Sequence, residues 1–172
     1  MIKKENQPSV GFAIEGHIQV EARDADTNEV LVCHDKDNLV VNTGLDRIMR
    51  LISGADTNAI GYGVAGTTAT ASASNTTSMG IDNAAQFKVD AAVARTGASN
   101  ESTAIAEYNW SYATNELTAA AQSAVSEVGL CVTNETDFAN NTLVARAAHG
   151  TINKDTTMTL SYTYTLKFQR TS

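Results

Sequence analysis

Four oxygen-bearing residues near the start of the chain are spaced in a way that faintly resembles a calcium-binding loop: Asp24, Asp26, Asn28 and Asp35. Calcium prefers oxygen ligands at alternating positions of such a loop. However, the position that needs glycine for the sharp turn holds Glu29, and the twelfth position holds an aspartate where a bidentate glutamate belongs. Asp and Asn are also frequent in hairpin turns, where their side chains bond to nearby backbone. We therefore interpret this segment as a turn.

The three histidines, His17, His34 and His149, are the other candidates for metal chemistry. His17 and His34 lie on neighbouring predicted strands and can face each other, with Cys33 beside them. A zinc site needs three or four converging nitrogen or sulfur ligands. Adjacent strand residues point to opposite faces, so Cys33 and His34 cannot both bind one metal without distortion. We predict structural histidines and no metal site.

Motifs for catalysis and cofactor binding are equally weak. A serine-nucleophile motif, G-x-S-x-G, does not occur. Residues 61–66 read GYGVAG and match the dinucleotide-binding pattern, but a Thr/Ser run follows where that motif requires a helix. Carboxylate pairs such as Glu21 and Asp24 exist without any sign of a cleft. We therefore expect no catalytic residues, no cofactor and no enzymatic activity.

An aromatic stripe is the remaining feature that suggests binding. Tyr108, Trp110 and Tyr112 alternate along one predicted strand and therefore share a face. Such a stripe can stack against a sugar. It can equally form a core or a subunit interface, since large aromatics dominate both. We favour the second interpretation.

Composition limits the classes of partner. The chain has 172 residues, one domain's length. Its net charge is −7, so it should repel phosphate backbones, and we expect neither nucleic-acid nor membrane partners. It contains 26 alanines and 22 threonines but only one proline. Large core-forming residues are sparse, which favours a narrow core or burial shared between subunits.

Cysteine usage and the first residues bear on the compartment. Cys33 and Cys131 are too few and too far apart for a typical disulfide framework, so we expect reduced thiols. The opening residues MIKKENQPSV contain two lysines but no apolar stretch of the kind found in signal peptides. We expect synthesis in the cytoplasm without export by a standard signal.

Alternating apolar residues predict about eight short strands separated by turn signals. The clearest strand, residues 157–169, places Met158, Leu160, Tyr162, Tyr164, Leu166 and Phe168 on one face. The other expected strands are residues 11–22, 29–35, 60–64, 85–95, 105–112, 124–132 and 142–148.

One helix is predicted near residues 43–53, where the apolar period changes to that of a helix. Leu45, Ile48, Met49 and Ile52 are spaced i, i+3, i+4 and i+7. Asn42 or Thr43 is expected to cap its start, and Gly54 to end it. A helix of about three turns is too short to stand alone and should pack against a sheet.

These elements predict a mainly β fold. The absence of alternating strands and helices favours an antiparallel β-sandwich, jelly-roll-like in form. Residues 1–10 are expected to form an N-terminal arm, and residues 11–172 a single domain. Within this domain, residues 66–79 are polar and Thr/Ser-rich, which predicts a loop.

Two stretches resemble a group of tailed-bacteriophage virion proteins. The first is NLVVNTGLDRIMRLISG at residues 38–54, followed by IGYGVAGTTAT. The second is SEVGLCV at residues 126–132, followed by LVARAAHGTINKDTTMTLSYTYTLKF at residues 143–168. The shared features are N-L-V-x-N-x-G before a short helix, then E-x-G-L and L-x-A-R strands, a lysine-bearing turn and a final alternating strand. Cys131 stands where the group more often has Phe or Tyr.

The resemblance implies a non-enzymatic structural protein of a virion, assembled in the host cytoplasm. Proteins of this group occur as tail, fibre, collar or head-decoration components, so the position in the particle stays open. The expected partners are copies of the chain itself and other virion proteins, with residues 1–10 and 66–79 as docking segments. The alternative is a receptor- or carbohydrate-binding module of a tail fibre, which requires an exposed aromatic at residue 108, 110 or 112.

Overall fold

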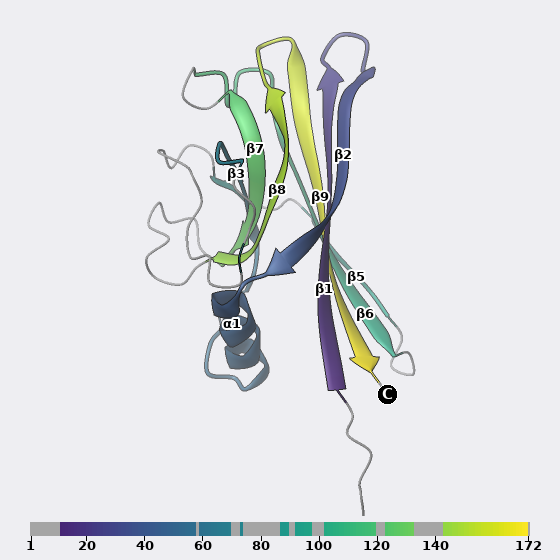
Figure 1. Ribbon diagram of the computed structural model, residues 1–172, viewed down its shortest axis with the longest axis vertical. Coiled ribbons are helices and arrows are strands. Elements are labelled where there is room, and N and C mark those ends of the chain that lie inside the picture. The colour runs from purple at the N-terminus through teal and green to yellow at the C-terminus, as the bar shows by residue number, and fades with distance from the viewer. Residues whose placement is uncertain are drawn as a thin grey trace, which may run out of the picture.

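The computed structural model in Figure 1 describes residues 11–57, 59–69, 73, 87–89, 92–97, 102–119, 123–132 and 143–171. The predicted arm at residues 1–10 lies outside these residues, as does most of the predicted loop at 66–79. Gly66 itself ends a strand, so the polar segment begins one residue later than expected.

Nine strands and one helix make up the described part of the chain. The helix, α1, spans Asn42–Ile52. The strands are β1 (Gly11–Asp24), β2 (Val30–Val40), β3 (Tyr62–Gly66), β4 (Phe87–Val89), β5 (Ala92–Thr96), β6 (Thr103–Tyr112), β7 (Ala124–Cys131), β8 (Leu143–Asn153) and β9 (Met158–Thr171). The predicted mainly β class with one short helix is therefore confirmed.

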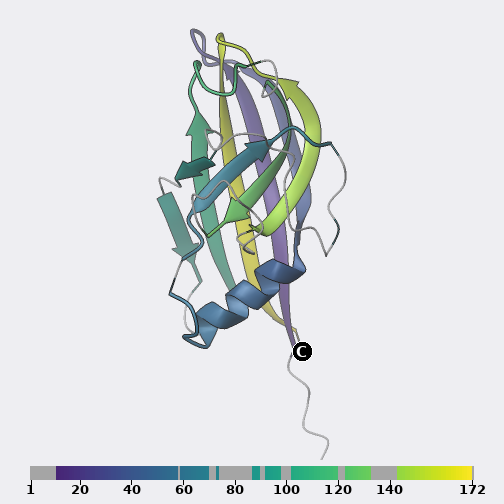
Figure 2. The same cartoon turned by 90° about the vertical axis from the view of Figure 1, so that its left-hand side faces the viewer.

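The strands form one antiparallel sheet in the order β4-β3-β7-β8-β2-β1-β9-β6-β5. Strand β2 joins its two halves. Residues from Val30 to Asn38 pair with β1, whereas Leu39 and Val40 pair with β8. The sheet curls about this strand, so that the two halves face each other in Figures 1 and 2. One continuous curled sheet is what the structure contains, and the expected sandwich or jelly roll is not confirmed.

The core lies inside the curl. The predicted apolar face of β9 points into it, with Leu160, Tyr162, Tyr164 and Leu166 almost fully buried. Across the core, a Cβ on Gly63 of β3 would lie 2.2 Å from the Trp110 ring of β6, so only glycine fits there. The backbone N–H of Ala65 donates a 3.0 Å hydrogen bond to the Tyr112 hydroxyl. These contacts hold the two halves of the sheet together.

The helix follows β2 directly and packs on β8. Gly44 makes the close approach, because a Cβ there would lie 1.9 Å from the Val144 carbonyl oxygen. The predicted side-chain cap was wrong. Val41 occupies the N-cap position, and the hydroxyl of Thr43 donates instead to the Leu143 carbonyl oxygen at 2.9 Å. Gly54 has a φ of 72° and ends the helix as predicted.

Candidate functional site

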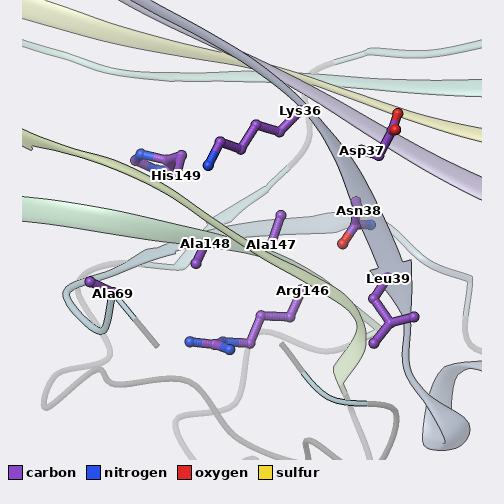
Figure 3. Close-up of a pocket in the computed structure, with 9 residues that line it drawn as sticks. All are labelled: Lys36, Asp37, Asn38, Leu39, Ala69, Arg146, Ala147, Ala148 and His149. Atoms are coloured by element: carbon purple, nitrogen blue, oxygen red, sulfur yellow. The ribbon is translucent and has the colours of Figure 1, made fainter. Parts of the chain in front are cut away.

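The pairing between β2 and β8 opens after two residue pairs. Leu39 pairs with Arg146 and Val40 with Ala145. The same register continued upward would pair residues 38, 37 and 36 with residues 147, 148 and 149, but the described pairing stops at Leu39. The strands separate there around a cleft of about 540 Å³. Figure 3 shows its lining: Lys36, Asp37, Asn38, Leu39, Ala69, Arg146, Ala147, Ala148 and His149.

The inner face of β2 is unusually polar for a strand that faces the core. Val32, His34, Lys36 and Asn38 alternate on the side shared with the buried residues of β1, since they pair with Ala22, Val20, Ile18 and Gly16. A Cβ on Gly16 would lie 2.6 Å from the Asn38 Nδ2, so the glycine makes room for the amide. The sequence pattern did not indicate Lys36 and Asn38 as site residues, because alternation alone does not say which face of β2 is inward.

Two histidines stack beside the cleft. The ring centroids of His34 and His149 lie 5.8 Å apart. Gly150 makes this possible, since a Cβ there would lie 2.5 Å from the His34 Cε1. His34 does not face His17, which the sequence left possible, because His17 pairs with Asp37 and lies on the opposite face of the sheet. The true partner of His34 is more than 100 residues away in the sequence.

Hydrogen bonds fix the His149 ring in one neutral form. Its Nδ1 lies 2.7 Å from the Gly150 carbonyl oxygen and therefore donates. Its Nε2 then accepts a 3.3 Å hydrogen bond from the Tyr162 hydroxyl. The pKa of His149 is lowered from 6.5 to about 4, chiefly by burial and to a smaller extent by the nearby His34 and Lys36, while the hydrogen bond to Gly150 acts in the opposite direction. At neutral pH the His149 ring is therefore uncharged, and its role is structural.

Several polar groups around the cleft have no hydrogen-bond partner within the described residues. They are the Asn38 Nδ2 and Oδ1 atoms and the His34 Nε2 atom, all buried. An unsatisfied buried polar group costs about 1–3 kcal/mol. The Lys36 ammonium, which extends toward His149 in Figure 3, makes no ion pair within the same part of the chain. The cleft therefore carries unused donors, an acceptor and one cation.

A buried ion pair lies next to the cleft, on β7 and β8. The Arg146 Nε donates to the Glu127 Oε2 at 2.6 Å, and both side chains are almost fully buried. The segment after β3 completes the arrangement, because the Thr68 N–H donates to Glu127 at 3.1 Å. A Cβ on Gly66 would lie 2.4 Å from the Glu127 Oε1. The carboxylate and the guanidinium are thus both used within the fold.

The sequence motifs of the resemblance meet at this junction. Glu127 belongs to the E-x-G-L stretch and Arg146 to the L-x-A-R stretch, and Gly129 pairs with Arg146 in the sheet. Gly44, from the N-L-V-x-N-x-G stretch, packs on the backbone of Val144. These motif residues form a structural junction among α1, β7 and β8.

The lysine-bearing turn of the resemblance also has a structural role. Lys154 is 2% exposed, and its Nζ donates to three carbonyl oxygens, those of Thr114, Asp155 and Met158, at 3.4, 3.2 and 3.0 Å. Burial lowers the pKa of this lysine. The ammonium closes the turn between β8 and β9 against the segment after β6.

The candidate calcium loop is a turn, as interpreted from the sequence. The Asp24 Oδ1 accepts hydrogen bonds from the N–H groups of Asp26 and Thr27 and from the Thr27 hydroxyl, at 2.8–3.0 Å. These bonds lower the pKa of Asp24. Asp35 lies on β2 beside His17, with 3.0 Å between Oδ1 and Nε2. The four candidate ligands do not converge.

The cysteines and the remaining histidine do not form a site. Cys33 is exposed and Cys131 buried, and both are free thiols. Burial raises the pKa of the Cys131 thiol far above its usual value. His17 lies on the outer face between Asp35 and Asp37, the latter at 3.4 Å. No group of three or more His, Cys, Asp or Glu residues suited to a metal ion occurs within the ranges described above.

The glycine motif and the aromatic stripe both belong to the core. Most of GYGVAG forms strand β3, so it is not a phosphate-binding loop. Tyr108, Trp110 and Tyr112 are 6%, 5% and 0% exposed. The Trp110 and Tyr162 rings stack with centroids 5.2 Å apart. These aromatics form core, as favoured above, and offer no platform for a sugar.

One face of α1 exposes apolar side chains. Leu45, Met49 and Ile52 are 41%, 61% and 72% exposed, and only Ile48 of the predicted apolar stripe is buried. The charged residues around them are paired: Arg47 with Asp56, and Arg50 with Asp46. We call the three exposed residues the helix patch. Three large apolar side chains exposed on one short helix are a candidate interaction surface.

The chain matches no protein-family model, and the comparisons with curated proteins and with solved structures gave no match. Among the helices that the structure describes, none is long and apolar enough to cross a membrane.

Proposed function

We propose that this chain is a non-enzymatic structural component of a bacteriophage particle, which attaches to or decorates the virion at the neck, the tail or the capsid surface. The observation that carries the proposal is the helix patch. Leu45, Met49 and Ile52 expose apolar surface beside charges that are already paired. Removing this apolar surface from water by contact with another apolar surface is favourable in free energy, so the helix patch suits assembly.

The sequence motifs support the choice of a virion protein. They resemble those of tailed-bacteriophage structural proteins, and their residues meet at one junction of buried side chains and close backbone contacts. Such a framework suits a protein that must persist outside the cell, where slow unfolding matters. In this proposal the curled sheet acts as a sandwich-like body, and copies of it associate through the helix patch.

Light scattering on the purified protein tests the assembly. We expect a closed oligomer such as a trimer, pentamer or hexamer, and we expect Met49→Glu to dissociate it into folded monomers. Leu31→Glu is the matched control, because Leu31 is 46% exposed but lies on β2, away from the helix patch. A wild-type monomer at every concentration would contradict self-assembly.

Immunogold electron microscopy tests the location. An antibody against the purified protein should label intact particles isolated from the source culture, at one kind of position on each particle. Antigen found only in the particle-free fraction would contradict a virion role, whatever the oligomeric state in solution.

A further inference from the structure

The cleft is bordered by β2 and β8, which belong to the same sheet but do not pair with each other along the cleft. Within the described residues, residues 36–38 of β2 pair only with β1 on one side of the cleft, and Ala147 and Ala148 of β8 pair with β7 on the other. Below the cleft the two strands pair directly. Strand edges offer rows of N–H and C=O groups that readily accept a further strand. Here two such edges face the same cleft.

The cleft has room for such a strand. Four residues of each strand, 36–39 and 146–149, line its walls (Figure 3). Leu39 and Arg146 pair with each other, so the open run on each strand is three residues, about 10 Å at about 3.3 Å per residue. The wall on β8 carries the small side chains of Ala147 and Ala148. The cleft of about 540 Å³ is therefore bordered on β8 by two small side chains, which leave space beside the strand.

Charge indicates what the strand should carry. Lys36 has no ion-pair partner within the described residues, although the chain as a whole has a net charge of −7. Asp37 does not neutralise it, because its side chain is fully exposed on the opposite face, beside His17. Arg146 is already paired with Glu127. An incoming carboxylate at Lys36 would meet the single uncompensated cation of the cleft wall.

A second copy of this chain does not supply that carboxylate from its described sheet edges. The two edge strands are β4, with the sequence FKV, and β5, with the sequence AVART. Each carries a basic residue and neither carries an acidic one. The described edges of a second copy therefore do not complement Lys36, which favours a strand from a different protein.

We propose that the cleft between β2 and β8 binds an extended acidic segment of another protein, which enters as an additional strand and places an Asp or Glu carboxylate beside Lys36. The guest backbone pairs with the free edges of β2 and β8. Asn38, whose amide is unpaired in the described chain, supplies a further donor and acceptor at the same place. This site does not depend on the helix patch, nor on whether the other protein belongs to a virion.

Peptide binding followed by NMR and by hydrogen exchange tests the proposal. The probe is acetyl-Thr-Val-Glu-Val-Thr-amide, with three comparison ligands: the same peptide with Lys for Glu, the same peptide N-methylated at alternate backbone nitrogens, and acetate alone. The acidic peptide should bind and protect the amides of residues 36–38 and 147–149 from exchange. The lysine peptide should bind about fivefold more weakly, as for a partly exposed ion pair.

Variants separate charge from folding. Lys36→Glu should reverse the preference between the acidic and the basic peptide, while leaving the circular dichroism spectrum unchanged, because Lys36 is exposed. Arg95→Glu is the matched control, since it makes the same charge change on β5 at the far edge of the sheet, and it should not alter binding.

Four outcomes would overturn the proposal. The first is absence of binding by the acidic peptide. The second is equal binding by the N-methylated peptide, which cannot form the backbone ladder. The third is full competition by acetate, which would make the cleft a site for small anions only. The fourth is concentration-dependent protection of residues 36–38 without any peptide, which would assign the cleft to a second copy.

Discussion

The Arg146 Nε lies 2.6 Å from the Glu127 Oε2 in a place where both side chains are shielded from water, with 4% and 0% of their surfaces exposed. The two residues are 19 positions apart and belong to neighbouring strands β7 and β8. Charges buried in this way are costly alone and acceptable together. Loss of either charged partner should therefore destabilise the fold at β7 and β8.

Replacing Arg146 with methionine should lower the free energy of unfolding by about 3–5 kcal/mol, because it leaves the Glu127 carboxylate buried without its cation. The double variant Glu127→Gln/Arg146→Met should recover part of this loss, since no charge then remains. Urea denaturation measures both. Lys167→Met is the control, because its partly exposed ion pair with Glu15 should contribute at most about 1 kcal/mol. Equal losses in the two single variants would contradict the burial argument.

Acid should weaken the fold through His149. Burial lowers its folded pKa from 6.5 to about 4, so the unfolded chain binds the proton more readily between these values. Stability from this residue is fully present above pH 6.5 and is lost as the pH falls toward 4. The loss should amount to about 3 kcal/mol. Protonation also places a charge beside His34 and Lys36, which line the same region.

The measurement is the unfolding free energy as a function of pH for the wild type and for His149→Gln, which cannot titrate. The variant should be less stable at pH 7, because glutamine packs differently against Tyr162, but its stability should change less between pH 6.5 and 4. Parallel curves for the two proteins would show that His149 is not the responsible group.

Replacement by alanine should have different effects on stability at two glycines, Gly44 and Gly61. Gly44→Ala should destabilise the protein by about 1–3 kcal/mol, because the new Cβ would lie 1.9 Å from the Val144 carbonyl oxygen and force α1 away from β8. This loss should appear although alanine favours a helix over glycine by about 1 kcal/mol. The midpoint of urea denaturation reports the change.

Gly61→Ala is the matched control. A Cβ at this position has no atom within 4 Å, and its φ is not in the left-handed region. Its stability should be unchanged or slightly higher. A Gly44→Ala protein as stable as this control would show that the contact between α1 and β8 is not close in solution.

Local pattern was enough to predict the helix and most of the strands. The single strand expected at residues 85–95 was wrong, because this stretch forms β4 and β5, which lie at opposite edges of the sheet. The strict alternation in residues 157–169 and the helical spacing from Leu45 to Ile52 are statements about neighbours in the chain, and both were confirmed. The turn at Asp24 was equally predictable, because its hydrogen bonds join residues at most three positions apart. The burial of the aromatic stripe also followed from what large aromatics usually do.

The periodicity of apolar residues could not predict contacts between residues that are distant in the sequence. Pairing and packing between separate elements bring His34 to His149, Gly44 to Val144 and Glu127 to Arg146. Alternation along β2 separated its residues into two faces but did not say that Lys36 and Asn38 lie inward. The physical reason is that periodicity reports the direction of side chains relative to their own strand. Which strand ends open a cleft, and which helix residues stay exposed, is decided by packing between elements.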